Sequence, residues 1–125
     1  MRETVIVHKL YDALLKQPLR PFPPPRQSID APAKRGVYVI YSPRGRVLHV
    51  GSTPKAREGI AQRLRDHLAA QSSFTQRYLG GEGTKLRKGY KFRCLVVPRS
   101  RQRALLEALA IGTLCPAHIG HGLDG

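Results

Sequence analysis

Two short runs of β-branched and aromatic residues, separated by a tight turn, constrain the fold of this chain more than any other feature. Residues 36–41 read Gly-Val-Tyr-Val-Ile-Tyr and residues 47–50 read Val-Leu-His-Val, which is typical of strands. The segment between them, Ser42-Pro43-Arg44-Gly45, places proline at the second and glycine at the fourth position of a turn. The sequence therefore predicts a β-hairpin.

The register of this hairpin decides which side chains share a face. If Tyr41 opposes Arg46, then Tyr38 opposes His49, and directly opposed residues lie on the same face of a sheet. A bulged turn with Gly45 in the left-handed conformation would shift the pairing by one residue. We expect Tyr38 and His49 to face each other and to point at one cleft.

Periodicity predicts helices around this hairpin. Apolar residues recur at helical spacing in 3–16 and 60–70, and serine at 72 or 73 can cap a short helix over 73–79. A third strand is predicted over 91–97, ended by Pro98, and a last helix over 101–114, ended by Pro116. The predicted fold class is α+β.

A proline-rich segment lies between the first helix and the hairpin. Six prolines fall within residues 18–33, which excludes regular helix or a central strand and predicts an extended arm. The arm is either a packed strap or a flexible linker, and Phe22 as an anchor favours the strap. We expect residues 1–33 to form an N-terminal helix and arm, and residues 34–125 to form the functional domain.

The charge of the chain points to a polyanionic partner. Lys and Arg number 22 against 8 Asp and Glu, which gives a net charge of +14. No stretch approaches the ~20 apolar residues of a membrane span, and no basic amphipathic helix with a wide apolar face suits a membrane surface. We therefore expect a soluble intracellular, cytoplasmic protein that binds nucleic acid.

Basic residues are also patterned along the chain. Residues 85–103 carry eight Lys and Arg and no acidic residue, which favours a phosphate-contacting strip over an ordinary solvated face. Basic residues also flank the start of the second helix. The predicted nucleic-acid contacts are Lys55, Arg57, Arg87, Lys88, Lys91 and Arg93.

Glu107 is an acidic residue in an otherwise apolar helix. Ala104, Ala110 and Ile111 flank it by helical geometry, and a buried carboxylate is costly unless it is paired or bound to metal. It is either an ion-pair partner of Arg101 or Arg103, or a metal ligand. Other candidates, Tyr38, His49, Arg63 and His67, are each ordinary structural residues when taken singly.

Their order and spacing resemble those of the GIY-YIG nuclease superfamily, over residues 36–119, about two thirds of the chain. Gly36-Val37-Tyr38 is similar to the first family motif, and His49-Val50-Gly51-Ser52 to the second except at its tyrosine. Residues 63–67, Arg-Leu-Arg-Asp-His, resemble the family's arginine helix. Glu107 and residues 109–116 resemble its glutamate helix.

The resemblance implies a small three-stranded antiparallel sheet flanked by helices, and hydrolysis of a phosphodiester with one divalent metal ion, Mg²⁺ or Mn²⁺. It implies that Glu107 holds the metal and that Tyr38 helps to activate the attacking water. Arg63 would stabilise charge on the phosphoryl group, and His67 would act near the leaving group.

The chain departs from the family pattern at two functional positions. His49 replaces the second tyrosine, and imidazole is a more plausible base than a phenol near neutral pH. The family's asparagine after the final proline is missing, which leaves His118 or His121 as substitutes. Ser52 is a further candidate within the second motif.

Three functions stay open at this point. The first is an endonuclease acting on DNA, with RNA as the second choice, and with structure-selective or weakly sequence-specific cutting. The second is a nucleic-acid-binding module on the same fold that does not cut. A third, suggested by charge alone, is a structural protein of the ribosome, and it gives no reason for Glu107.

Overall fold

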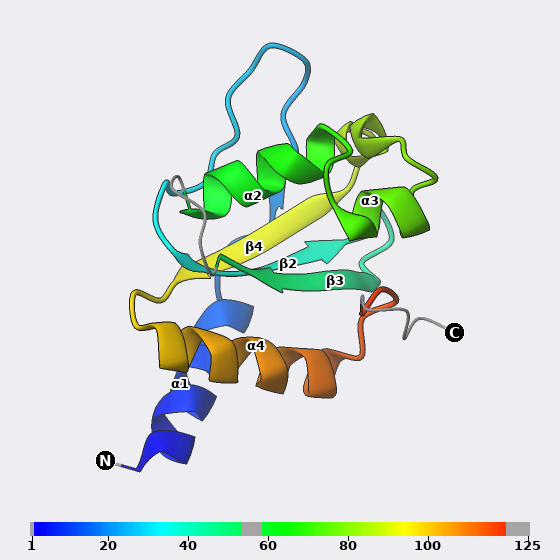
Figure 1. The fold of residues 1–125 in the computed structure, drawn as a ribbon. Helices are drawn as coiled ribbons and strands as arrows, with labels where there is room; N and C mark the ends of the chain where they lie inside the picture. Colours follow the sequence, from blue (N-terminus) through cyan, green and yellow to red (C-terminus); the bar gives the residue numbers. More distant parts are fainter. Residues whose placement is uncertain (1, 54–58, 120–125) are drawn as a thin grey trace.

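The computed structural model describes residues 2–53 and 59–119, which form an α+β fold (Figure 1). Its sheet is antiparallel and has four strands in the order β1-β4-β2-β3, one more than the expected three. The strands are β1 (Arg20–Pro21), β2 (Gly36–Tyr41), β3 (Val47–Ser52) and β4 (Lys91–Val96).

Helices cover both faces of the sheet. Helix α2 lies on one face, and α1 and α4 lie on the other (Figure 1). The helices are α1 (Glu3–Leu15), α2 (Gly59–Leu68), α3 (Ser73–Tyr78), the short 3₁₀ helix η1 (Gly83–Arg87) and α4 (Ser100–Leu114). The four predicted α-helices are therefore confirmed to within two residues at each end, and η1 lies in a segment for which the sequence predicted no helix.

Strand β2 supplies side chains to two separate cores because successive residues of a strand point to opposite faces. Tyr38 and Ile40 pack on the α2 side with Ile60 and Leu64. The alternate residues of β2, Val37, Val39 and Tyr41, pack on the other side with an aliphatic set from α1, β3 and α4: Leu14, Val50, Leu106 and Ala110. All six residues of β2 are buried, so this strand forms the centre of the molecule.

The hairpin register differs from the expected one by two residues. Tyr38 pairs with Gly51, and His49 pairs with Ile40, so Tyr38 and His49 are diagonal neighbours instead of opposed. One residue of shift comes from the turn, where Gly45 has a φ of 88° and forms the bulged three-residue loop. The other comes from a bulge in β3, where the pairing slips between Ile40 and Tyr41.

Because the two shifts add to an even number, Tyr38 and His49 still share one face of the sheet, as expected. Leu48 is the extra residue of the second bulge, and its side chain packs in the same core as Tyr38.

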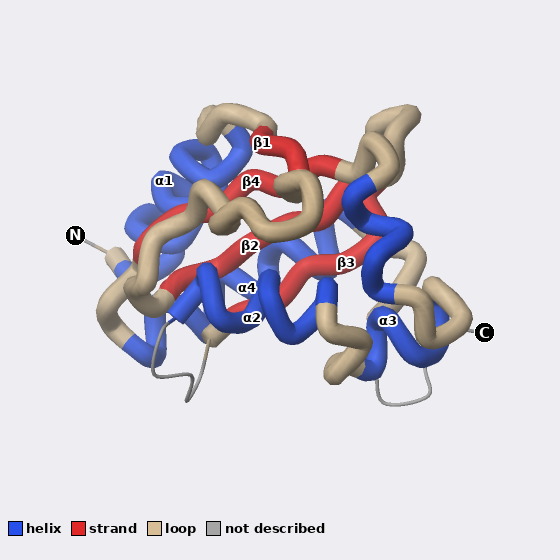
Figure 2. The backbone as a smooth tube through the Cα atoms, turned by 90° about the horizontal axis from the view of Figure 1, so that it is seen from above, coloured by secondary structure: helices blue, strands red, loops and turns tan. Residues whose placement is uncertain are grey.

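The proline-rich segment is a packed strap, as Phe22 suggested. Its residues Arg20 and Pro21 form β1 beside β4, which adds the fourth strand at an edge, where proline is tolerated. Phe22 is buried and meets Phe92 edge-on, with ring centroids 5.2 Å apart. Figure 2 shows the following loop lying across the sheet on the α2 side. The strap therefore contributes to the same core as α2.

Candidate functional site

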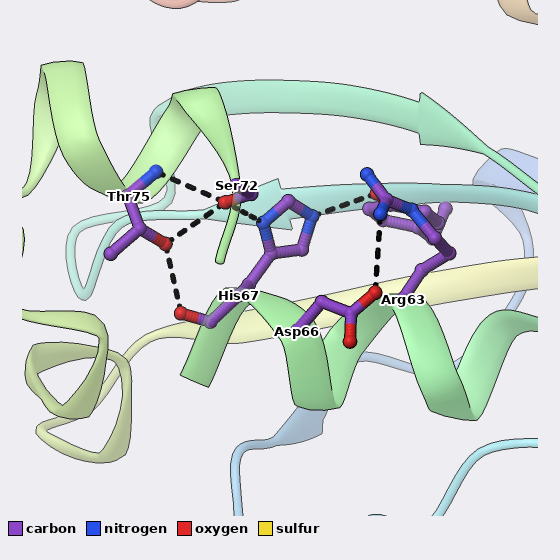
Figure 3. Close-up of polar contacts among 6 residues, drawn as sticks. Arg63, Asp66, His67, Ser72 and Thr75 are labelled. Atoms are coloured by element: carbon purple, nitrogen blue, oxygen red, sulfur yellow. Dashed lines mark hydrogen bonds and ion pairs between the residues drawn. The ribbon is translucent and has the colours of Figure 1, made fainter. Parts of the chain in front are cut away.

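A chain of hydrogen bonds runs through the core on the α2 side (Figure 3). The Tyr38 hydroxyl lies 2.7 Å from His67 Nε2, and His67 Nδ1 lies 2.6 Å from Ser72 Oγ. Ser72 donates to Thr75 Oγ1, which in turn donates to the backbone carbonyl of His67 at 2.8 Å. These contacts join β2, α2 and the start of α3.

The direction of each hydrogen bond in this series follows from its last member, Thr75, whose hydroxyl donates to the His67 carbonyl. Since the Ser72 hydroxyl proton goes to Thr75, Ser72 Oγ can only accept from His67, so His67 carries its proton on Nδ1. His67 Nε2 is then an acceptor, and the Tyr38 hydroxyl donates to it. We infer a neutral His67 and a protonated Tyr38.

The pKa shifts of both groups agree with this assignment. Burial lowers the pKa of His67 well below its usual value, and the nearby His49, Arg63 and His118 lower it further. Burial raises the pKa of Tyr38 to about 12, although the neighbouring Arg63 guanidinium opposes the shift. Neither group changes charge near neutral pH.

Complete burial changes the roles that Tyr38 and His67 can have. Both side chains have no exposed surface, so the expectation that Tyr38 points with His49 into one cleft is wrong for Tyr38. The cause lies partly at Gly51, whose missing side chain leaves room for the tyrosine: a Cβ atom there would meet the Tyr38 hydroxyl at 2.3 Å. Tyr38 and His67 therefore contact other protein groups and not solvent.

His49 and His118 belong to the same buried cluster. The His49 ring stacks on Phe74 with centroids 4.9 Å apart and lies 5.1 Å from the His67 ring. His118 lies 5.3 Å from His49, and its Nε2 is 3.3 Å from Ser73 Oγ. The structure thus places His49, which is half-buried, beside Tyr38 and His67, and places the buried His118 beside His49 and Phe74.

Arg63 stands at the outer end of this cluster and is about one third exposed. Its guanidinium binds Asp66 one turn further along α2, at 3.2 Å (Figure 3). Asp66 was not among the residues selected from the sequence, although its spacing of three from Arg63 is the usual signal for such a pair. Asp66 holds Arg63 beside Tyr38, whose pKa the guanidinium lowers through its charge and a side-chain hydrogen bond.

Glu107 comes from α4 and is half-buried, less than its apolar helix suggested. Its carboxylate accepts a hydrogen bond from Ser52 Oγ at 3.0 Å. Burial raises the pKa of Glu107, while Ser52 and the positive charge of Arg63 lower it. The carboxylate therefore lies close enough to Arg63 to feel its field, although the two residues come from helices on opposite faces of the sheet.

The ion pair of Glu107 with Arg101 or Arg103, which was the alternative to metal binding, does not appear among the contacts of these two arginines. Arg101 binds Glu3 at the surface, at 2.7 Å. Arg103 is buried and donates to the carbonyl oxygens of Val97 and Pro98. Ion pairing with these two arginines therefore does not explain why α4 carries this carboxylate.

Ser52 and Glu107 fit a hard divalent cation. Mg²⁺ prefers oxygen ligands and is usually held by one or two carboxylates, with waters and substrate phosphates completing its shell. Within residues 2–53 and 59–119, no group of three or more His, Cys, Asp or Glu side chains is arranged to hold a metal. A cation here would rest on Glu107 with waters and substrate oxygens.

The predicted basic strip does not form one continuous surface. Arg93 is turned inward: it donates to the Leu15 carbonyl and lies 5.1 Å from the centroid of the Tyr41 ring. Lys88 and Lys91 are exposed, and Arg87 donates to the Pro23 carbonyl at 2.5 Å. The expected lack of acidic partners is wrong for Lys85 and Arg101, which pair with glutamates. Lys55, Arg57 and His121 lie outside the described residues.

Comparison with known proteins adds no further assignment, because neither a protein-family model nor a curated protein sequence matches the chain. Among the described residues, no helix has the length and apolar character needed to cross a membrane. The functional argument therefore rests on the motifs and on the geometry of the site.

Proposed function

We propose that the chain is a metal-dependent endonuclease of the GIY-YIG type that hydrolyses phosphodiester bonds in DNA, with RNA as the second substrate to test. One observation carries the proposal: a half-buried carboxylate, Glu107, is held by a hydrogen bond from Ser52 at the end of β3, and the charge of the partly exposed Arg63 reaches it. Binding alone in a protein of charge +14 gives no use for a desolvated carboxylate, because its charge repels phosphate.

Each side chain then has a role set by its position. Glu107 holds the divalent cation, and Ser52 orients the carboxylate by its hydrogen bond. A cation there would lower the pKa of a bound water and stabilise charge on phosphoryl oxygens. Arg63 binds the phosphoryl oxygens through the donors that Asp66 does not occupy. Tyr38 is a positioning residue, because its buried hydroxyl stays protonated and donates a hydrogen bond to His67.

The second candidate is a nucleic-acid-binding module that does not cut. The burial of Tyr38 and His67 favours it, since it removes two of the groups that the family resemblance assigns to proton transfer. Arg63 and Glu107 favour the enzyme. The two functions differ in what happens when the Glu107 charge is removed.

Glu107→Gln keeps the shape of the side chain and removes its charge. We expect cleavage to fall about a thousandfold or more, because a metal ion supplies several kcal/mol of transition-state stabilisation and each ~1.4 kcal/mol is a factor of ten. The fold should keep or gain stability, since the raised pKa of Glu107 means that ionising it costs stability as pH rises through that range. The measurements are nicking of single-stranded, duplex and branched DNA with Mg²⁺ or Mn²⁺, and thermal unfolding.

Glu82→Gln is the matched control, because Glu82 is exposed and pairs with Lys85 at the surface. It should cleave like the wild type. A Glu107→Gln protein that cleaves normally would refute the proposed role. If the wild type binds these DNA substrates or RNA but cuts none of them with Mg²⁺ or Mn²⁺, the binding module would be established instead.

A further inference from the structure

A groove lined by three arginines lies beside α2, outside the site described above. Its walls are residues 26–29 of the strap, together with Arg65, Leu68 and Ala69 of α2 and Arg87 of η1. Its volume is about 470 Å³. We call it the arginine groove.

The charge of the arginine groove is uniform. Among the residues that the structure describes, no Asp or Glu lines it. Arg87 is fixed by its hydrogen bond to the Pro23 carbonyl. Because a carbonyl is neutral, this contact leaves the guanidinium positively charged. The groove therefore presents a field suited to anions.

Arg26 occupies a backbone position that arginine disfavours. The amide of Gln27 donates to the carbonyl of Pro24 at 3.2 Å, which closes a turn with Pro25 and Arg26 at its centre. Arg26 has a φ of 71°, as the third residue of a type II turn requires, and glycine or asparagine normally stands there. A bulky residue kept in such a conformation is a pointer to function.

We propose that the arginine groove binds the phosphate backbone of a nucleic acid, at a distance from the reacting group. Guanidinium groups bind phosphate oxygens in bidentate fashion. Ser28 and Gln27 add hydroxyl and amide donors of the kind that contact phosphates and sugars. Ile29, Leu68 and Ala69 are aliphatic, and no aromatic ring lines the described groove for base stacking. The contacts are to the backbone, without reading of sequence.

The position of the groove makes it a second contact on a polymer. Arg63 and Arg65 are two residues apart, so they project from nearly opposite sides of α2. A ligand touching both must cross the helix, whose diameter with side chains is about 10–12 Å. A mononucleotide reaches one side only, whereas a strand reaches both. The inference rests on the proposed function for its choice of nucleic acid, and it does not depend on cleavage.

The test uses Arg26→Gly, which removes the guanidinium and installs the residue that the turn prefers. Binding of labelled single-stranded and duplex oligonucleotides is measured by fluorescence anisotropy in EDTA at several salt concentrations. We expect affinity to fall about three- to tenfold, equally for unrelated sequences, and the salt slope to decrease by about one. The melting temperature should stay the same or rise.

Two further variants separate a local contact from net charge. Arg26→Lys keeps the charge and loses the bidentate geometry, so it should keep the salt slope of the wild type and lose less affinity than Arg26→Gly. Arg44→Gly removes one exposed arginine from the β2–β3 turn and should change affinity less than Arg26→Gly. Equal losses for Arg26→Gly and Arg44→Gly, or no loss for Arg26→Gly, would overturn the proposal.

The outcomes also separate this inference from the proposed function. If the wild type binds and does not cleave, while Arg26→Gly binds more weakly, the arginine groove stands and the nuclease assignment fails. If the wild type cleaves and Arg26→Gly binds as tightly as the wild type, the nuclease stands and the groove fails. A mononucleotide that competes as well as an oligonucleotide at equal phosphate concentration would refute the polymer contact.

Discussion

The two faces of the sheet are built from different chemistry. On the α2 side, Tyr38, His49, His67 and His118 surround Phe74 in a polar and aromatic core. On the α4 side, the core is almost wholly aliphatic. Both faces are supplied by the same strand, β2, through the alternation of its side chains. The core of the α2 face therefore contains a chain of hydrogen-bonded side chains, whereas the core of the α4 face is formed mainly by aliphatic packing.

This difference separates stability from the placement of the site. Aliphatic burial is favourable without directional requirements, so the α4 side can stabilise the fold while Glu107 at its border remains available. Buried polar groups are costly unless each finds a partner, and the chain from Tyr38 to Thr75 supplies those partners. The polar side chains on the α2 side thus contribute less hydrophobic stabilisation than aliphatic ones would, but their hydrogen bonds fix the positions of the groups next to Arg63.

The largest effect is expected on the aliphatic face. Leu14 of α1 is fully buried there, and Leu14→Ala should lower the free energy of unfolding by about 2–5 kcal/mol, the usual cost of a cavity. Urea unfolding measures it. Cleavage per folded molecule should not change, because Leu14 lies on the face away from the Arg63 cluster. A specific loss of activity at full folding would show that the two faces are not separable.

A smaller effect, depending on pH, should come from the polar face. The folded pKa of His67 lies below its ordinary value of 6.5, so below pH 6.5 the unfolded chain binds a proton that the folded protein does not. Stability is then complete above about pH 6.5 and falls as pH drops toward the lowered pKa, by up to ~1.4 kcal/mol per pH unit for one such group.

Urea unfolding of the wild type and of Leu14→Ala at several pH values tests this assignment. Both proteins should lose stability on acidification in parallel, because Leu14 belongs to the other face. His67→Gln removes the titrating group and should flatten the curve between pH 6.5 and 5. An unchanged slope in that variant would assign the acid sensitivity to other groups.

The smallest effect is expected for Tyr38→Phe, which removes one hydroxyl from the polar chain. His67 Nε2 then loses its donor, at a cost of about 1–2 kcal/mol. Stability of the wild type should also fall as pH rises from 10 toward the raised pKa of about 12, since the unfolded chain releases the phenolic proton first. Tyr38→Phe should show a smaller alkaline loss, since burial also raises the pKa values of Tyr41 and Tyr11, which remain. Thermal unfolding at pH 7, 10 and 11 measures both effects. Retained cleavage would support a positioning role for Tyr38.

Much of the fold could be predicted from local signals. Helical spacing of apolar residues, prolines at helix ends and the serine cap at Ser72 placed the four α-helices. The runs at 36–41 and 47–50 placed the hairpin, and Phe22 marked the strap. These signals act within one or two turns of chain, so the sequence displays them directly.

The remaining features depend on partners that are distant in sequence. Glu3 binds Arg101 across 98 positions, and Arg93 donates a hydrogen bond to a carbonyl of α1. The sequence therefore does not show which basic residues of 85–103 are exposed and which already have partners. The burial of Tyr38 depends on Gly51 and on a polar chain reaching Thr75. Candidate residues were therefore easier to find than their roles.

The two irregularities of the hairpin act as a matched pair. The bulged turn at Gly45 and the bulge at Leu48 each advance the pairing by one residue, and together they restore the original alternation of side chains. A protein with only one of them would present residues 49–52 in the opposite sense. Val50 would then point at the aromatic core, and Ser52 would turn away from Glu107. Insertions and deletions in this hairpin should therefore be tolerated in steps of two.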